Sequence, residues 1–250
     1  MMMADPHAPG RAQRVVMLAA LATVTLLAWI WLMRSAASPH HLHMAMSPGH
    51  SHHPFDLWMF ASTVAMWQAM MVAMMTPTVV RWVFAFAALT GRGTLWRTAG
   101  FAAGYFAVWL AYSLAAASVQ IALQRGGLLG MGGRLPASAG GAVLIAAGLL
   151  YFTPFSRACL RHCRNPLTYF LARWDNAPPS GFRIGLTHGA YCVGCCWAAM
   201  VTGFAMGVMN LLWMALLTVL MCVEKLAPRG DRIGAVASAA MVVWGVALFW

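Results

Sequence analysis

Six long segments without a charged side chain constrain this sequence more than any other feature. They are Val15–Met33, Leu57–Val80, Thr98–Gln124, Leu135–Ser156, Ile184–Val223 and Ile233–Trp250. A helix needs about 20 apolar residues to cross a hydrocarbon core about 30 Å thick, and every segment approaches or exceeds that length. Only helices and closed barrels satisfy the backbone within lipid, and these segments lack the alternating pattern of barrel strands.

The fifth segment has 40 residues, twice the length of one span, so we expect the chain to turn inside it at Gly207–Asn210. The predicted fold class is therefore all-α, a polytopic membrane helix bundle with seven transmembrane helices. Their expected ranges are 15–33, 57–80, 98–123, 136–156, 185–207, 211–226 and 233–250.

Composition agrees with lipid as the main solvent. Hydrophobic residues make up 62% of the chain and charged residues 8%, against roughly a quarter in an ordinary soluble domain. This excludes a soluble enzyme with a charged surface and a disordered protein. The net charge of +11 comes from basic residues scattered between the apolar segments, so the expected partner is the lipid bilayer and not nucleic acid.

The basic residues also predict an orientation. With the N-terminus inside, only Arg34, Arg125 and Arg134 lie outside, and the other thirteen basic residues lie inside. We expect a bacterial inner-membrane protein with its C-terminus outside. It has an inner tail (1–14), one membrane domain (15–250), an outer loop (35–54) and a basic inner loop (157–183). The first span also resembles a signal peptide, but its length favours an uncleaved helix.

The outer loop contains six of the nine histidines, together with Met44 and Met46. These histidines are His40, His41, His43, His50, His52 and His53. Imidazole and thioether groups bind late transition metals, and a short histidine-rich tract is typical of metal binding. The alternative is a polar, flexible loop that binds metal adventitiously.

The fifth segment carries a second candidate site. His188, Cys192, Cys196 and Met200 follow each other at four-residue spacing, which places them on one helix face, and Cys195 flanks them. Thiol, imidazole and thioether groups together suit Cu(I), and also Zn(II) or Hg(II). The alternative is packing, because cysteine is among the most frequently buried residues.

Methionines on the second segment form a third group. Met66, Met70 and Met74 share a face, and counting from the helix ends places Met66 and Met70 level with Cys195 and Cys196. We expect these thioethers to face the thiols, although methionine also serves as a gap filler between helices.

The inner side holds Cys159, His162 and Cys163 within five residues. All six thiols fall in the inner half of the membrane or at its middle, which favours reduced thiols that receive or release metal over a disulfide framework. Inert packing is the alternative for Cys159 and Cys163. The neighbours Glu224 and Lys225 fit a paired anchor at an inner helix end. Phosphate-binding loops and paired carboxylates are absent, so we do not expect an enzyme.

Several motifs resemble a bacterial family described as predicted metal-binding integral membrane proteins. They are the methionine-rich stretch Trp67–Pro77, the Cys-X-X-Cys-Cys-Trp element Cys192–Trp197 with Met200, the segment Gly207–Asn210, the pair Glu224–Lys225 and the inner segment Cys159–Pro166. The resemblance covers roughly residues 55–230 and implies metal binding within the membrane. It brings no assigned reaction, and the histidine-rich loop lies outside its motifs.

The resulting hypothesis is a membrane protein that binds copper, as Cu(I), and transports it or delivers it to a cuproprotein. Two other classes stay open. One is an accessory subunit of a larger complex, such as a copper oxidase or monooxygenase. The other is a membrane redox protein that uses its thiols for electron transfer. Mercury handling is a narrower alternative, because adjacent thiols suit that ion.

Overall fold

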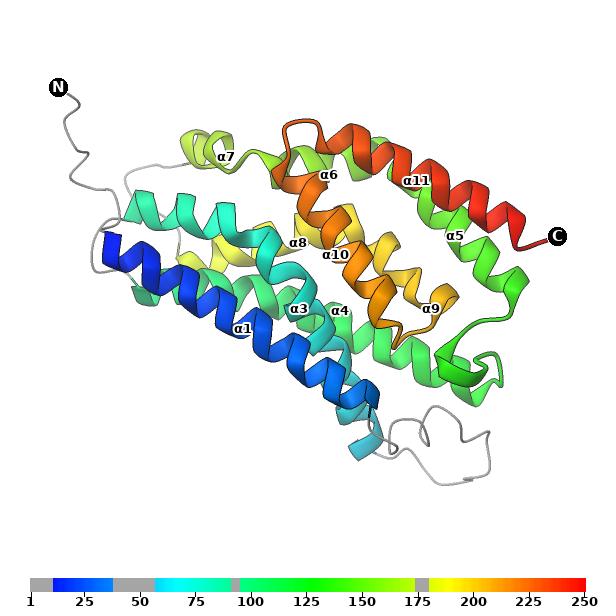
Figure 1. The fold of residues 1–250 in the computed structure, drawn as a ribbon. Helices are drawn as coiled ribbons and strands as arrows, with labels where there is room; N and C mark the ends of the chain where they lie inside the picture. The colour runs from blue at the N-terminus through cyan, green and yellow to red at the C-terminus, as the bar shows by residue number, and fades with distance from the viewer. Residues whose placement is uncertain (1–10, 38–56, 91–94, 174–179) are drawn as a thin grey trace.

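The apolar segments form α-helices that pack lengthwise into a bundle (Figure 1). The computed structural model describes residues 11–37, 57–90, 95–173 and 180–250. Its helices are α1 (Arg11–Ala37), α3 (Leu57–Thr90), α4 (Leu95–Arg125), α5 (Ala137–Tyr151), α6 (Pro154–Arg164), α7 (Pro166–Arg173), α8 (Gly181–Val201), α9 (Gly203–Met206), α10 (Leu211–Leu226) and α11 (Gly230–Ala247), with a 3-10 turn at Met131–Gly133. These ranges contain no β-strand, so the all-α class is confirmed.

The number of membrane-length helices in the described ranges is smaller than the seven expected. Four are long and apolar enough to cross a membrane, namely α1, α3, α4 and the stretch Gly181–Met206, and a fifth arises if α5 and α6 count as one bent span. Helix α10 has 16 residues, about 24 Å at the usual rise, and the first turn of α11 contains the charged pair Asp231 and Arg232. Seven spans and their orientation stay predictions.

Two expected segments differ in the structure. The range 136–156 is not one helix, because α5 ends at Tyr151 and α6 starts at Pro154 with a bend of 65°. Proline suits the first turn of a helix, and the Thr153 hydroxyl accepts a hydrogen bond from the Ser156 amide, so a new helix begins here. The range 157–183, expected as a loop, contains the rest of α6 and all of α7. The six histidines of the outer loop lie outside the described residues.

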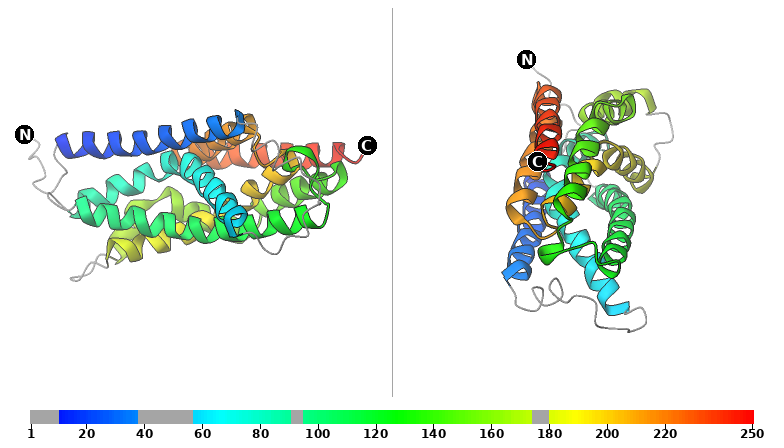
Figure 2. Two further views of the ribbon diagram at one scale, coloured as in Figure 1. Left: turned by 90° about the horizontal axis from the view of Figure 1, so that it is seen from below. Right: turned by 90° about the vertical axis from the view of Figure 1, so that its right-hand side faces the viewer.

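Helix α1 lies on the outside of the bundle and packs against α3 (Figures 1 and 2). It buries Met17, Leu32 and Ser35 and leaves most of its large apolar side chains exposed, as a helix facing lipid would. The start of α1 and the end of α11 lie at opposite ends of the bundle (Figure 2).

Helices α4 and α8 touch through their backbones. A methyl group at Gly104 would collide with the carbonyl oxygen of Phe182, and one at Gly185 with the carbonyl oxygen of Phe101. Small residues four apart permit such close approach between membrane helices. The contact brings Tyr105 of α4 against the buried face of α8.

Buried hydrogen bonds fix α3 against its neighbours. Trp67 Nε1 donates to Gln120 Oε1 at 2.8 Å, and Trp82 Nε1 donates to the carbonyl oxygen of Cys163 at 2.8 Å. An unpaired polar group is costly in an apolar interior, so these bonds determine how α3 is rotated against α4 and α6. Helix α3 contains Pro77 and changes direction along its length (Figure 2).

We expect Gly185→Ala to destabilise the protein, because its methyl group has no space beside the Phe101 carbonyl. Overpacking of this kind costs about 1–3 kcal/mol. Thermal unfolding in detergent micelles measures the loss. Gly100→Ala is the matched control in the same interface, since its methyl group would meet the Phe182 amide nitrogen at an ordinary 3.6 Å. Equal melting temperatures for the two variants would contradict the close contact.

Candidate metal centre

The buried face of α8 carries the predicted series of ligand-type side chains. His188, Cys192, Cys196 and Met200 lie along this face, and each side chain is no more than 3% exposed. The four-residue spacing turns all four toward the interior of the bundle. None of these thiols therefore faces lipid, and all six cysteines of the chain are free.

Cys192 is the centre of a cluster assembled from several helices. Its sulfur atom lies 3.0 Å from Lys225 Nζ of α10 and 3.1 Å from the hydroxyl oxygen of Tyr105 of α4. The same ammonium lies 3.9 Å from Cys196 Sγ and 4.0 Å from Met75 Sδ of α3. We call these five residues, Cys192, Cys196, Met75, Tyr105 and Lys225, the thiol centre.

Lys225 reaches the thiol centre because it continues the buried face of α10. Met214, Leu217 and Met221 precede it on that face at helical spacing. Glu224 is also buried but points elsewhere, since its carboxylate lies over Gly234 beside the Tyr151 hydroxyl. The prediction that Glu224 and Lys225 form a paired anchor at an inner helix end is therefore wrong, because the two buried side chains point in different directions. The part of the chain that the structure describes has one ion pair, Arg164 with Asp231.

Cys195 contacts Cys192 on its own helix and also reaches the cysteines of α6. Its sulfur atom lies 3.9 Å from Cys163 Sγ. Cys159, one turn earlier on α6, packs over Gly194, the residue before Cys195. We call Cys159, Cys163 and Cys195 the α6–α8 thiols. The structure thus brings the inner cysteines to α8, where Cys163 contacts both Cys195 and Cys192, so the α6–α8 thiols adjoin the thiol centre.

His188 and His162 lie in a stack of rings instead of among the sulfur atoms. The His188 ring stacks on Trp82 with 3.9 Å between centroids, and the His162 ring stacks on Tyr191 at 3.9 Å. Burial among rings leaves His188 Nδ1 without a hydrogen-bond partner. His188 lies one helical turn before Cys192, so this nitrogen is close to the thiol centre but outside its sulfur contacts.

The predicted methionines gather around a small cavity. Its volume is about 20 Å³, and thioethers make up much of its wall. The methionines that line it are Met70, Met71, Met74, Met200 and Met214, and the tryptophans are Trp67 and Trp213. Met66 is also buried on α3. Met70 of α3 and Met200 of α8 both line this cavity.

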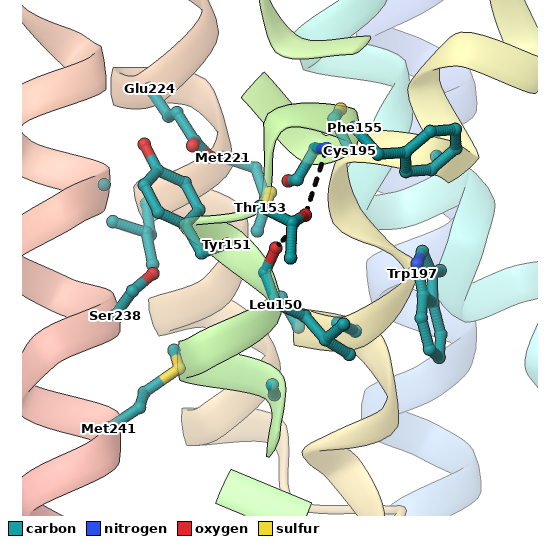
Figure 3. A pocket seen from close by; sticks show the side chains of 17 residues that line it. Leu150, Tyr151, Thr153, Phe155, Cys195, Trp197, Met221, Glu224, Ser238 and Met241 are labelled. Carbon is teal, nitrogen blue, oxygen red and sulfur yellow. Dashed lines mark hydrogen bonds between the residues drawn. The ribbon is translucent and has the colours of Figure 1, made fainter. Parts of the chain in front are cut away.

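A second cavity, of about 130 Å³, opens between α5, α6, α8, α10 and α11 (Figure 3). Figure 3 shows Cys195 and Phe155 on one side of it and Tyr151, Glu224 and Ser238 on the other. The bend between α5 and α6 places Thr153 at the middle of this wall. Cys195 therefore contacts Cys163 and also borders a space large enough for several water molecules.

The donor set is chemically soft but not a conventional closed metal site. Over the described ranges, no three His, Cys, Asp or Glu side chains are grouped as metal ligands. Instead, two thiols and a thioether surround an ammonium, and further thioethers and thiols lie one helical turn away on either side. Thiol and thioether sulfur select Cu(I) over harder ions. The sequence interpretation missed Lys225 and Tyr105 as site residues. For Lys225, the i, i+4 spacing from the buried Met221 is the signal that indicated an inward direction.

Comparison with protein families identifies the family of this chain. The profile of PpoB2, a family described as copper chaperones, matches residues 64–248. No curated protein and no solved structure matches the chain. The matched range starts within α3 and includes both groups of thiols and the methionine cavity, whereas α1 and the histidine-rich segment precede it.

We expect mild oxidation of the metal-free protein with diamide to join Cys163 to Cys195, because their sulfur atoms lie close enough for a small side-chain movement to bridge them. Peptide mapping by mass spectrometry identifies the linked residues. Cys195→Ser should abolish the link, and Cys222→Ser, which removes a thiol of α10, should leave it unchanged. A link that persists in Cys195→Ser would contradict this pairing.

Proposed function

The chain belongs to the PpoB2 family of copper chaperones, and we propose that it binds Cu(I) within the membrane and delivers it to a cuproprotein. One observation carries the proposal: the buried thiols Cys192 and Cys196 of α8 and the thioether Met75 of α3 converge on one point, the ammonium of Lys225. Copper is the cargo in this proposal, and the chain's residues are its temporary ligands.

The thiol centre suits temporary binding of Cu(I). Cys192 and Cys196 lie one helical turn apart on the same buried face, so both sulfur atoms can contact one ion. Sulfur ligands suit Cu(I), and a centre with few ligands leaves positions open for an incoming donor. Zn(II) and Hg(II) are the other ions that this donor set accepts.

The methionine cavity supplies a route to the thiol centre. Met74 of its wall precedes Met75 of the thiol centre in the chain, and Met200 lies one helical turn from Cys196. Thioethers bind Cu(I) without carrying charge, so an ion can move from one to the next. We place Met70, Met74 and Met200 on this route, with Met66 next to it.

The α6–α8 thiols provide the route on the other side. Cys195 lies on the same turn of α8 as Cys192 and Cys196, and Cys163 lies 3.9 Å from it. Ligand exchange along Cys192, Cys195 and Cys163 would carry copper to α6, which also contains Cys159 and His162. His188 precedes Cys192 by one turn on the buried face of α8. From its place in the ring stack, its imidazole would help to hold the ion.

In the bilayer we propose seven spans, with the N-terminus inside and the C-terminus outside the bacterial inner membrane. The distribution of basic residues supports this orientation. The histidine-rich loop would then capture or release copper on the outer side, through His40, His41, His43, His50, His52 and His53.

A thiol redox function is the second candidate, and the distance of 3.9 Å between Cys163 and Cys195 favours it. A redox protein would cycle this pair between thiol and disulfide, whereas a chaperone needs it reduced to bind copper. A third candidate is an accessory subunit of a copper enzyme complex, which would co-purify stably with the enzyme subunits.

We expect Cys192→Ser combined with Cys196→Ser to abolish high-affinity Cu(I) binding, since serine oxygen is a poor ligand for this ion. Removal of both main donors should weaken affinity by about 100-fold or more. Competition with a Cu(I) chelator, without oxygen, measures it on the full chain. Cys222→Ser is the matched control and should bind as the wild type does. Equal affinity of the double variant and the wild type would overturn the proposal.

The methionine route has its own test. Met70→Leu, Met74→Leu and Met200→Leu together should keep the fold, because leucine has a similar volume, but slow copper uptake by about tenfold. Stopped-flow transfer from a Cu(I) chelator measures the rate. Met17→Leu on α1 is the control. Unchanged uptake would exclude the cavity as a route and leave copper binding at the thiol centre intact.

A further inference from the structure

The ammonium of Lys225 is the least expected group in the interior. Lysine is almost never fully buried unless it is paired, yet this side chain is 2% exposed. A long side chain near a helix end normally extends to the membrane surface, whereas this one turns into the bundle. Its contacts are sulfur atoms and not a carboxylate, at 3.0 Å to Cys192, 3.9 Å to Cys196 and 4.0 Å to Met75.

Packing alone does not explain a lysine at this position. A methionine or leucine would fill the same volume, and an apolar replacement of a buried charge is often neutral or stabilising. Glu224, the adjacent acid, points toward Gly234 and Tyr151 and forms no ion pair with Lys225. The positive charge is therefore placed against the thiols, the groups that carry negative charge when they bind metal.

The charges of a loaded thiol centre balance only with Lys225 and a monovalent ion. Two thiolates carry a charge of −2 and Cu(I) carries +1, which leaves −1 without Lys225. The ammonium brings the sum to zero, whereas a divalent ion such as Zn(II) would bring it to +1. Uncompensated charge is expensive in a low-dielectric interior, so the neutral combination is favoured.

We propose that Lys225 is the built-in counter-ion of the loaded thiol centre and makes that centre selective for monovalent copper over divalent ions. This rests on the proposed function, because it concerns the same thiols. Copper enters and leaves as Cu(I), with no oxidation. Bonds form from copper to Cys192 Sγ and Cys196 Sγ, and any proton that these thiols carried passes to water. Lys225 is a positioning residue here, not a ligand of the ion.

The test compares Cu(I) and Zn(II) affinities of the full chain in detergent, without oxygen, using a competing chelator for each metal. Lys225→Met and Lys225→Gln remove the charge, and Lys225→Arg keeps it. Loss of a group that supports metal ligands should lower Cu(I) affinity by about 10–100-fold. The ratio of Cu(I) to Zn(II) affinity should fall in both uncharged variants and recover in Lys225→Arg. Circular dichroism selects the variants that keep the wild-type helix content.

An unchanged ratio in a folded uncharged variant, or an equal fall in Lys225→Arg, would overturn the counter-ion role and leave copper binding standing. The wild type gives a test that needs no variant at Lys225. The double variant Cys192→Ser, Cys196→Ser identifies the Zn(II) that binds at the thiol centre, because it lacks both thiols. If the wild type binds one equivalent of Zn(II) at this centre as tightly as it binds Cu(I), the proposed selectivity is wrong. If the wild type binds no Cu(I), the proposed function itself fails.

Discussion

The backbones of α4 and α8 meet at glycines, and the position of the thiol centre depends on this contact. Because Gly104 and Gly185 carry no side chain, the carbonyl of each facing helix occupies the space where a methyl group would be. The approach is close enough for the Tyr105 hydroxyl to reach Cys192 Sγ. Lys225 of α10 places its ammonium against the same sulfur atom from another direction. A wider α4–α8 spacing would separate the hydroxyl from the thiol and open the centre.

Much of the fold follows from the apolar pattern, because lipid permits few alternatives to helix. The expected turn at Gly207–Asn210 is where the structure ends α9 at Met206 and starts α10 at Leu211. Gly207 has a φ of 100°, a conformation that favours glycine, and the Asn210 side chain caps α10. The face of His188, Cys192, Cys196 and Met200 also follows from spacing alone. The break at Tyr151 and Pro154 was missed, because the apolar run continues across it.

The site was harder to predict than the fold. Spacing shows which residues share a face but not how each helix is rotated and shifted against its neighbours. This is why spacing did not show that Cys195 also contacts Cys163 of α6. Lys225 was assigned to the membrane edge because charged residues near helix ends usually reach water. Its inward direction depends on the rotation of α10, which hydropathy does not determine.

The narrowness of the methionine cavity has a consequence for ions in water. Its volume of about 20 Å³ is close to the space that one water molecule needs, so an ion surrounded by its hydration shell does not fit. An ion that enters must lose its water and accept sulfur in exchange. Mg²⁺ gives up water reluctantly and prefers oxygen, which sulfur cannot replace. On the copper route that we propose, this loss of water would favour soft ions before they reach the thiols.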